Sequence, residues 1–210
     1  MDNVIVSRHP LIQDKLGRLR DVRTEASAFR LLVRQLALLM TYEATEDLKT
    51  DEVEVQTPLA TARVHTIARR AICIVPVLRA GLGMVEGMLE LLPHAAVGHI
   101  GVERNPETHL PSEYYCKLPE PVRDYQFIIA DPMLATGGSA TWVVDAIKKR
   151  GAQDIRLVAL IAAPEGIRRV QASHPDVRIH VAAIDERLDE NAYIVPGLGD
   201  AGDRLYQTSH

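Results

Sequence analysis

The run IIADPMLATGGSA, in the middle of the chain, changes from apolar to small and polar residues at Asp131. Gly137 and Gly138 would let the backbone approach a ligand closely, because glycine carries no side chain. Thr136 and Ser139 add hydroxyl donors, and an ionised Asp131 can only accept hydrogen bonds. A phosphate beside a sugar diol is the chemistry that these residue types suit.

The elements that flank this run place it at the edge of a sheet. The segment YQFIIAD is apolar enough for a buried strand. Residues 139–150 predict a helix with one apolar stripe, made of Ala140, Val143, Val144 and Ile147. Ligands of open α/β sheets bind beyond the carboxyl ends of the strands, and a helix N-terminus carries unpaired N–H groups and about half a positive charge. We therefore expect a phosphate cradle between a strand tip and a helix start.

Two other interpretations of the run were weighed against the cradle. A nucleoside-triphosphate P-loop requires GxxxxGK followed by Ser or Thr, and no lysine follows Gly137 or Gly138, which excludes it. An ordinary strand-loop-helix turn with Ser139 as the helix N-cap stays open from the residues alone. Asp131 and Thr136, placed beside the glycines, favour the cradle.

Strands and helices alternate over most of the chain. The apolar segments AICIVPVL, AAVGHIGV, YQFIIAD, IRLVALIAA and VRIHVAAI predict strands, and MVEGMLELL and PEGIRRVQASH predict helices between them. Parallel neighbours need a crossover connection, so this pattern predicts an α/β fold with a doubly wound, mostly parallel sheet. A length of 210 residues suits a single domain spanning 1–210.

The segments outside this alternation are expected to decorate the sheet. Thr24 is predicted to cap a long helix that runs to about Leu48. The alternating segments EVEVQTP and ATARVHTI predict an antiparallel hairpin near an edge, with Pro58 at the break. Residues 103–121 and 193–210 are too long to be simple connections.

Composition limits the function classes. A net charge of −4 and a pI near 6.1 disfavour nucleic-acid and membrane-surface partners, which would need a basic surface, and favour small-molecule substrates. No stretch reaches the roughly 18 apolar residues of a membrane span, and no apolar signal region is found, so a cytoplasmic protein is expected.

Cys73 and Cys116 form no disulfide or metal pattern, and Cys73 is expected in the core. The histidines show no metal-binding spacing and are assigned no chemistry.

The run DPMLATGGSA closely resembles the 5-phosphoribosyl 1-diphosphate loop of the type I phosphoribosyltransferases, in the form found in the uracil-specific enzymes. VPVLRAGLGMV, EYYCKLP, LIAAPEG, HPDV and YIVPGLGDAGDR are also similar to segments of that family, so the resemblance spans nearly the whole chain. It implies a type I phosphoribosyltransferase-like sheet with a β-arm excursion and a C-terminal base-binding hood. It also implies transfer of 5-phosphoribosyl from its 1-diphosphate to N1 of uracil, which gives uridine monophosphate and pyrophosphate in pyrimidine salvage.

Arg79 is the cation for which a role can be argued most directly. It precedes a predicted helix N-terminus, where the helix dipole disfavours a cation by roughly 0.3 to 1 kcal/mol, so a functionless arginine is unexpected there. The resemblance implies that Arg79 holds the pyrophosphate group, which a guanidinium fork fits well. An arginine that reaches solvent or pairs with a carboxylate is the alternative.

The resemblance implies a set of residues for each substrate. Catalytic roles would fall to Arg79, Asp131 and Asp200. The 5-phosphoribosyl 1-diphosphate site would consist of Arg79, Arg104, Asp131, Pro132, Met133, Leu134, Ala135, Thr136, Gly137, Gly138, Ser139 and Asp200. The uracil site would consist of Tyr193, Ile194, Gly199, Asp200 and Ala201, largely through backbone atoms. Exposed main chain offers N–H donors and carbonyl acceptors, which match the carbonyl groups and the N3–H of uracil. Cytosine has an amino group and an unprotonated ring nitrogen in those places, so the same main chain would not match it.

Arg104 departs from the family pattern in its neighbours. Family members commonly have an aromatic residue and an aspartate beside this arginine, whereas this chain has Glu103 and Asn105. Whether Arg104 and the 103–118 arm touch substrate is therefore open, and a solvated arm arginine is the alternative.

The resemblance also implies partners. Magnesium would arrive mainly bound to the substrate, with Asp200 as its protein contact, because this chain has Ala130 before Asp131 where many type I enzymes have two adjacent acids. GTP as an activator and a homodimer or higher homo-oligomer are further expectations. The alternative function is a nucleotide-sensing, RNA-binding regulator on the same fold, which the acidic balance disfavours because it would need a basic face.

Overall fold

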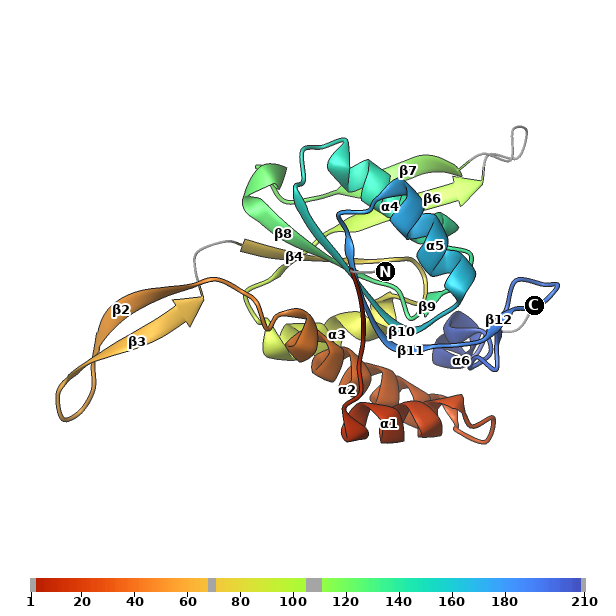
Figure 1. Cartoon of the computed structure of the whole chain (residues 1–210), viewed down its shortest axis with the longest axis horizontal. Coiled ribbons are helices and arrows are strands. Elements are labelled where there is room, and N and C mark those ends of the chain that lie inside the picture. Colours follow the sequence, from red (N-terminus) through yellow and green to blue (C-terminus); the bar gives the residue numbers. More distant parts are fainter. Residues whose placement is uncertain (1–2, 68–70, 105–110, 209–210) are drawn as a thin grey trace.

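The computed structural model describes residues 3–67, 71–104 and 111–208. A sheet forms the centre of the molecule (Figure 1), with strand order β1-β11-β10-β8-β4-β5 and with β9 paired to β10. Every neighbouring pair in it runs parallel. Its strands are β1 (Val4–Val6), β4 (Ala71–Pro76), β5 (Ala96–Val97), β8 (Tyr125–Ala130), β9 (Met133–Leu134), β10 (Asp154–Ala162) and β11 (Arg178–Ile184).

Helices cover both faces of the sheet (Figure 1). One face carries α1 (Pro10–Arg20), α2 (Ala26–Ala44) and α3 (Leu82–Leu91). The other carries α4 (Gly138–Lys148) and α5 (Pro164–Ser173). The expected α/β, doubly wound fold with a mostly parallel sheet is confirmed.

The two faces of each central strand build two hydrophobic cores. In β4, Ile72 and Ile74 belong to the core under α1, α2 and α3, whereas Cys73 and Val75 belong to the core under α4 and α5. Successive side chains of a strand point to opposite faces, so a strand covered on both sides has no polar alternation. Burial of each large aliphatic side chain contributes roughly 1.5 to 3 kcal/mol. Cys73 is fully buried, which confirms its predicted place in the core.

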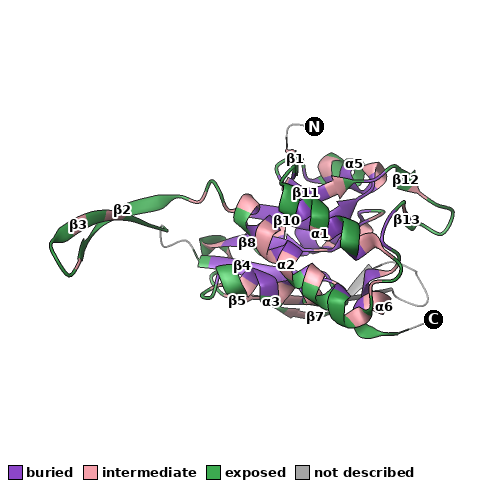
Figure 2. Cartoon of the chain, turned by 90° about the horizontal axis from the view of Figure 1, so that it is seen from below, coloured by how far each residue is buried: buried purple, intermediate pink, exposed green. Residues whose placement is uncertain are grey.

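Two antiparallel hairpins form ladders of their own, separate from the ladder of the central sheet. The first, β2 (Thr50–Gln56) with β3 (Thr61–Ile67), confirms the predicted hairpin and projects from the body of the molecule (Figure 2). The second is β6 (His99–Arg104) with β7 (Pro111–Lys117). Neither hairpin shares a strand ladder with the central sheet. The alternation of polar and apolar residues in β2 and β3 is therefore the pattern of a separate two-stranded arm, the β2–β3 arm.

The segment AAVGHIGV, predicted as one strand, is two. β5 pairs with β4 inside the central sheet, whereas β6 pairs with β7 in the second hairpin. Between them, the N–H of Gly98 donates to the carbonyl of Ile74 at 2.8 Å, and Ile100 then forms an isolated parallel bridge with Val77, just beyond the end of β4. The apolar pattern continues through this change of partner, so it could not mark the point where the chain leaves the sheet.

Two predictions near the N-terminus are wrong or incomplete. Thr24 does not cap α2: its hydroxyl donates to the carbonyl of Arg18 at 2.6 Å, at the end of α1, and Glu25 is the N-cap of α2. The helix also ends at Ala44, short of Leu48, and Thr45 follows it as the C-cap. The short strand β1 was not predicted, because its three residues carry too little pattern to separate a strand from a loop.

The C-terminal part folds back over the carboxyl ends of the strands (Figures 1 and 2). It contains a two-stranded ladder of β12 (Arg187–Leu188) with β13 (Ile194–Val195), and the short helix α6 (Ala201–Tyr206). A 3-10 turn, η1 (Val122–Asp124), precedes β8. Among the described residues, the helices are all too short or too polar to cross a lipid bilayer.

Candidate active site

A pocket of about 230 Å³ opens where β4 and β8 end. It joins segments that are far apart in the sequence: the loop after β4, the loop after β8, the start of α4 and the start of α6. Asp131 and Ser139, expected at a strand tip and a helix start, both line it. The lining residues are Val77, Leu78, Arg79, Ala80, Asp131, Met133, Ser139, Asp200 and Gly202.

Asp131 is held at the tip of β8 by main-chain contacts. Its N–H donates to the carbonyl of Val158 at 3.1 Å, and its Oδ1 accepts from the N–H of Met133 at 3.3 Å. Burial raises the pKa of Asp131 to about 7, although the hydrogen bond from Met133 lowers it. Near neutral pH the carboxyl group can therefore exist in either form, and a ligand that donates hydrogen bonds would favour the ionised form.

The loop between Asp131 and α4 turns sharply at its end. Gly137 is the N-cap of α4 with a φ of 73°, a left-handed conformation that glycine adopts without strain. A Cβ on Gly137 would lie 2.6 Å from the carbonyl oxygen of Gly166. Ser139 is the second residue of α4, not its N-cap, so the ordinary capping interpretation is wrong. The hydroxyl of Thr136 accepts from the N–H of Gly138 at 3.4 Å and closes the turn.

Pro132 and Leu134, predicted to contact the phosphate, are buried away from the pocket. The carbonyl of Pro132 accepts from the N–H of Ile161 at 3.1 Å, and the carbonyl of Leu134 accepts from the N–H of Ala163 at 2.9 Å. These bonds fasten the loop to β10 and to the start of α5. Within the expected set, Ala135, Thr136, Gly137 and Gly138 lie in the same loop but do not line the pocket, whereas Met133 does.

Arg79 lies between β4 and α3 and is about half exposed, at 55% of its side chain. Its Nη2 lies 3.6 Å from Oδ1 of Asp203, and its Nη1 donates to the hydroxyl of Thr208 at 3.4 Å. The hydroxyl of Tyr206 donates to the main-chain carbonyl of Arg79 at 3.2 Å. Arg79 therefore pairs with a carboxylate, that of Asp203, as the alternative interpretation of this arginine expected. The pair lies at the rim of the pocket, because Arg79 also lines the pocket.

The residues expected to contact uracil do not all face the pocket. Asp200 lines it, and its side chain also accepts from the N–H of Asp203 at 2.8 Å as the N-cap of α6. Ile194 and Ala201 are buried, and Tyr193 is 43% exposed. The backbone beside Asp200 has the left-handed conformation at Gly199, with a φ of 77°. Of the two residues that flank Asp200, Gly199 is exposed and Ala201 is buried, so the main chain of Gly199 is the accessible part.

Arg104 ends β6, and its side chain lies outside the part of the chain that can be described. The expected contact between Arg104 and the diphosphate substrate therefore stays a prediction, as does the contact of the arm.

Several residues at or beside the pocket were not predicted from the sequence. Asp203 was not predicted as a site residue, although its spacing from Asp200 places both on one helical turn. Gly166, in the quoted segment LIAAPEG, was not predicted as a site residue, and a Cβ added to it would lie 2.4 Å from the carbonyl oxygen of Ala135. Leu78, Ala80 and Gly202 also line the pocket, and no local pattern in the sequence indicates this.

The parallel sheet and the pocket at its carboxyl edge define a type I phosphoribosyltransferase. The hypoxanthine phosphoribosyltransferase of Trypanosoma cruzi has a similar fold, with a TM-score of 0.51 at 11% identity over 76% of this chain and 75% of that one. A family model described as uracil phosphoribosyltransferase matches residues 6–208. The chain belongs to the uracil phosphoribosyltransferase family, which confirms the resemblance.

Individual relatives agree with this family. The uracil phosphoribosyltransferase of Thermoanaerobacter sp. (strain X514) is 57% identical over 206 residues, which cover 98% of each chain. That of Geobacillus kaustophilus is 56% identical over 208 residues, covering 99% of this chain and 100% of the relative. The solved structure of the AQ2163 protein from Aquifex aeolicus has a TM-score of 0.90 at 40% identity, covering 98% of this chain and 99% of that one.

Proposed function

We propose that the protein transfers 5-phosphoribosyl from 5-phospho-α-D-ribose 1-diphosphate to N1 of uracil and releases pyrophosphate. The observation that supports this most strongly is the meeting of Arg79, Asp131, Ser139 and Asp200 in one pocket. They supply one cation, two carboxylates and a hydroxyl at the start of a helix, which suits a sugar with a phosphate on either side. The membership of the family supports the choice of uracil as acceptor.

The 5-phosphate is assigned to the loop of residues 136–139. The N-terminus of α4 presents main-chain N–H groups and the positive end of the helix dipole. Gly137 keeps the backbone accessible, and the hydroxyls of Thr136 and Ser139 add donors. This site would bind the phosphate equally in substrate and product, so it orients the sugar and does not drive the reaction.

Asp131 is assigned to the hydroxyls of the ribose. It lies beside Ser139 in the pocket, so a sugar whose phosphate sits at α4 would extend toward it. Two hydroxyl donors would stabilise its ionised form and lower its raised pKa. Asp131 thus holds the sugar in place while the bond at C1 changes.

Arg79 is assigned to the pyrophosphate that leaves. In the reaction the bond between C1 and the pyrophosphate oxygen breaks, the bond between C1 and N1 forms, and the N1 proton is released. No covalent nucleophile is needed, because pyrophosphate is a good leaving group and positioning with charge stabilisation suffices. The guanidinium of Arg79 would take up the negative charge that develops on pyrophosphate.

The main chain around Asp200 is assigned to the base. The exposed backbone at Gly199, with the main chain that follows it toward Ala201, would offer an acceptor and donors to the N3–H and the carbonyl groups of uracil. Tyr193 is exposed enough to flank the ring, and Ile194 is buried beneath the segment. Cytosine carries an amino donor where uracil has a carbonyl, so a fixed main chain would reject it.

The residues present fit magnesium that arrives with the substrate. Among the described residues, His, Cys, Asp and Glu form no group of three that could enclose an ion. The pocket offers the carboxylates of Asp131 and Asp200, which suit one open side of a hydrated Mg²⁺. Bound there, the ion would neutralise charge on the diphosphate, and Asp200 is the protein contact that we assign to it.

The assembly and the activator extend the proposal. The projecting β2–β3 arm exposes Val53, Val55 and Ile67, and an isolated two-stranded hairpin is marginally stable, so a homodimer or higher homo-oligomer would stabilise it. Activation by GTP and a cytoplasmic location rest on the family alone. Sedimentation tests the oligomeric state, and measurement of the reaction rate at increasing GTP concentration tests the activation.

Release of pyrophosphate that depends on uracil is the direct test. We expect turnover with uracil and 5-phosphoribosyl 1-diphosphate in the presence of Mg²⁺, and little with orotate, hypoxanthine or cytosine. Equal rates with any of these bases would reject uracil as the acceptor. An absence of turnover, with binding of nucleotide and RNA, would point to the regulator instead.

A further inference from the structure

The segment that carries the proposed base-binding backbone is tied to the N-terminal helices by two arginines, one from outside the segment and one within it. This segment, residues 185–206, is called the hood below. Its own ladder, β12 with β13, has only two pairs, and α6 is a short helix. Two stronger anchors connect it to the N-terminal helices, and both use an arginine.

The first anchor joins the end of α1 to the start of the hood. Nη1 and Nη2 of Arg20 donate to the two carboxylate oxygens of Asp185 at 2.8 and 2.5 Å. Nη1 of Arg20 also donates to the carbonyl of Gly197 at 2.6 Å, and the N–H of Gly197 donates to Asp185 at 2.9 Å. The side chain of Asp185 is 5% exposed. Both main-chain polar groups of Gly197 are thus bound to one partly buried ion pair, two residues before Gly199.

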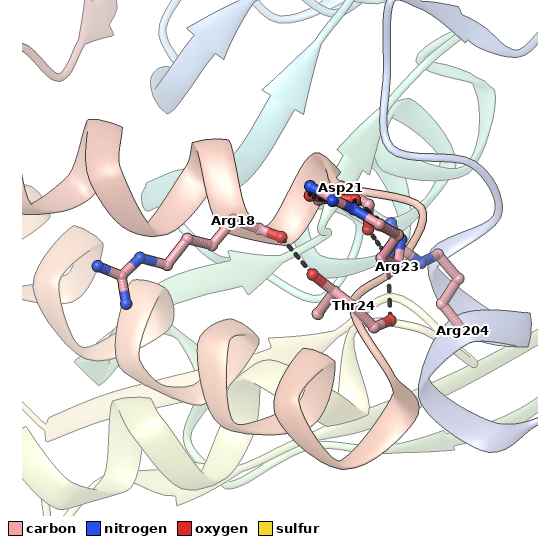
Figure 3. Close-up of polar contacts among 5 residues, drawn as sticks. All are labelled: Arg18, Asp21, Arg23, Thr24 and Arg204. Carbon is pink, nitrogen blue, oxygen red and sulfur yellow. Dashed lines mark hydrogen bonds and ion pairs between the residues drawn. The ribbon is translucent and has the colours of Figure 1, made fainter.

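The second anchor joins α6 to the turn between α1 and α2 (Figure 3). The guanidinium of Arg204 donates to the main-chain carbonyls of Asp21 at 2.7 Å and Thr24 at 3.3 Å, both residues of that turn. It also donates to the carbonyls of Leu19 at 2.8 Å and Leu198 at 2.9 Å. The carbon of the guanidinium also lies 4.3 Å from the centre of the buried Phe29 ring. Only a planar fork with several donors can reach all four oxygens at once.

The two anchors bracket the residues that would read the base. Gly197 and Leu198 are bound directly, and the next residues, Gly199 to Ala201, lead into the pocket at Asp200. Recognition by main chain depends on the position of the whole segment, because no side-chain rotamer can correct a displaced backbone. A displacement of about 1 Å can lower a rate by on the order of a hundredfold.

We propose that Arg20 and Arg204 are positioning residues for uracil, and that the turn at residues 18–24 serves as the platform that fixes the base-reading backbone. The inference rests on the proposed function. It assigns the N-terminal helices, which contribute no lining residue to the pocket, a part in the choice of base.

Arg204→Gln is the main test variant, because it keeps much of the side chain and removes the charged fork. We expect the KM for uracil to rise about tenfold or more, while the KM for 5-phosphoribosyl 1-diphosphate changes less than about threefold. Arg204→Lys, which keeps the charge but not the fork, should recover only part of the uracil affinity. Asp185→Asn should reproduce the pattern through the other anchor. Arg123→Gln is the matched control, since the side chain of Arg123 is 77% exposed on η1, outside both the hood and the platform.

Hydrogen exchange measured without substrates provides a readout that does not depend on activity. In Arg204→Gln, amides of residues 197–201 should exchange about tenfold faster, while those of the central sheet keep their protection. Equal increases in both KM values, or unchanged exchange at 197–201 in both anchor variants, would overturn the inference. If the wild type fails to use uracil while the local exchange still rises, the proposed function fails and the anchoring stands.

Discussion

Arg79 and Asp203 face each other at the rim of the pocket, with Nη2 of the arginine 3.6 Å from Oδ1 of the aspartate. The hydroxyl of Thr208 donates to the same Oδ1 at 2.7 Å and accepts from Arg79 at 3.4 Å. A half-exposed ion pair of this kind contributes only about 0 to 1 kcal/mol. A diphosphate with several charges could therefore replace Asp203 as the partner of Arg79 at little cost, and Asp203 keeps the arginine near the pocket.

Substitution of Arg79 tests whether the cation acts on the leaving group. Arg79→Ala should lower kcat/KM by about a hundredfold or more, because the lost interaction is strongest when charge develops on pyrophosphate. Arg79→Lys should recover part of the rate, since a lysine keeps the charge without the fork. Steady-state kinetics measure both. Arg123→Ala, a change at an arginine whose side chain is 77% exposed on η1, is the control, and a near-normal rate in Arg79→Ala contradicts the role.

The raised pKa of Asp131 predicts how the activity depends on pH. Because burial raises this pKa to about 7, the ionised form that accepts from the ribose is incomplete below neutral pH. We expect kcat/KM for the diphosphate substrate to rise with pH and to level off above about 7. Asp131→Asn should be slower and should lack this rise. The titration of the free substrate is measured separately, so that its own pKa is not mistaken for that of Asp131. A wild-type profile of kcat/KM that is flat between pH 5 and about 7 counts against the assignment.

The same group predicts an opposite trend for stability. The folded pKa of Asp131 is raised from 3.8 to about 7, so the folded state holds its proton more tightly than the unfolded state does. Its contribution to the free energy of unfolding is therefore fully present below about pH 4 and is lost as the pH rises through 7. Denaturant unfolding of the ligand-free protein should show the wild type losing stability relative to Asp131→Asn over this range. A constant difference between the two proteins would contradict the raised pKa.

The local part of the site could be predicted from the sequence, and the assembled part could not. Asp131 and Ser139 belong to one strand-loop-helix unit, whose periodicity and glycines are visible in a short window. Arg204, in contrast, binds carbonyls of Leu19 and Asp21, more than 180 residues away, and main-chain carbonyls have no sequence signature. The error at Thr24 has a similar cause, because a hydroxyl between two helices can bond to either end and the residue type does not select one.

Gly137 tests whether the shape of the loop itself matters. Gly137→Ala places a Cβ in the left-handed conformation and within 2.6 Å of the carbonyl oxygen of Gly166, so the loop must move. We expect the free energy of unfolding to fall by about 1 to 3 kcal/mol. We also expect the KM for 5-phosphoribosyl 1-diphosphate to rise about tenfold, because the start of α4 no longer meets the phosphate.

Gly17→Ala is the matched control for this change. Gly17 lies inside α1, and no heavy atom lies within 4 Å of an added Cβ, so alanine should stabilise the helix by about 0.5 to 1 kcal/mol and leave both KM values unchanged. Chemical unfolding and steady-state kinetics on the two variants separate strain at the phosphate loop from the general effect of a glycine substitution. If Gly137→Ala loses stability but binds the diphosphate substrate as the wild type does, the loop is a structural turn and the phosphate binds elsewhere.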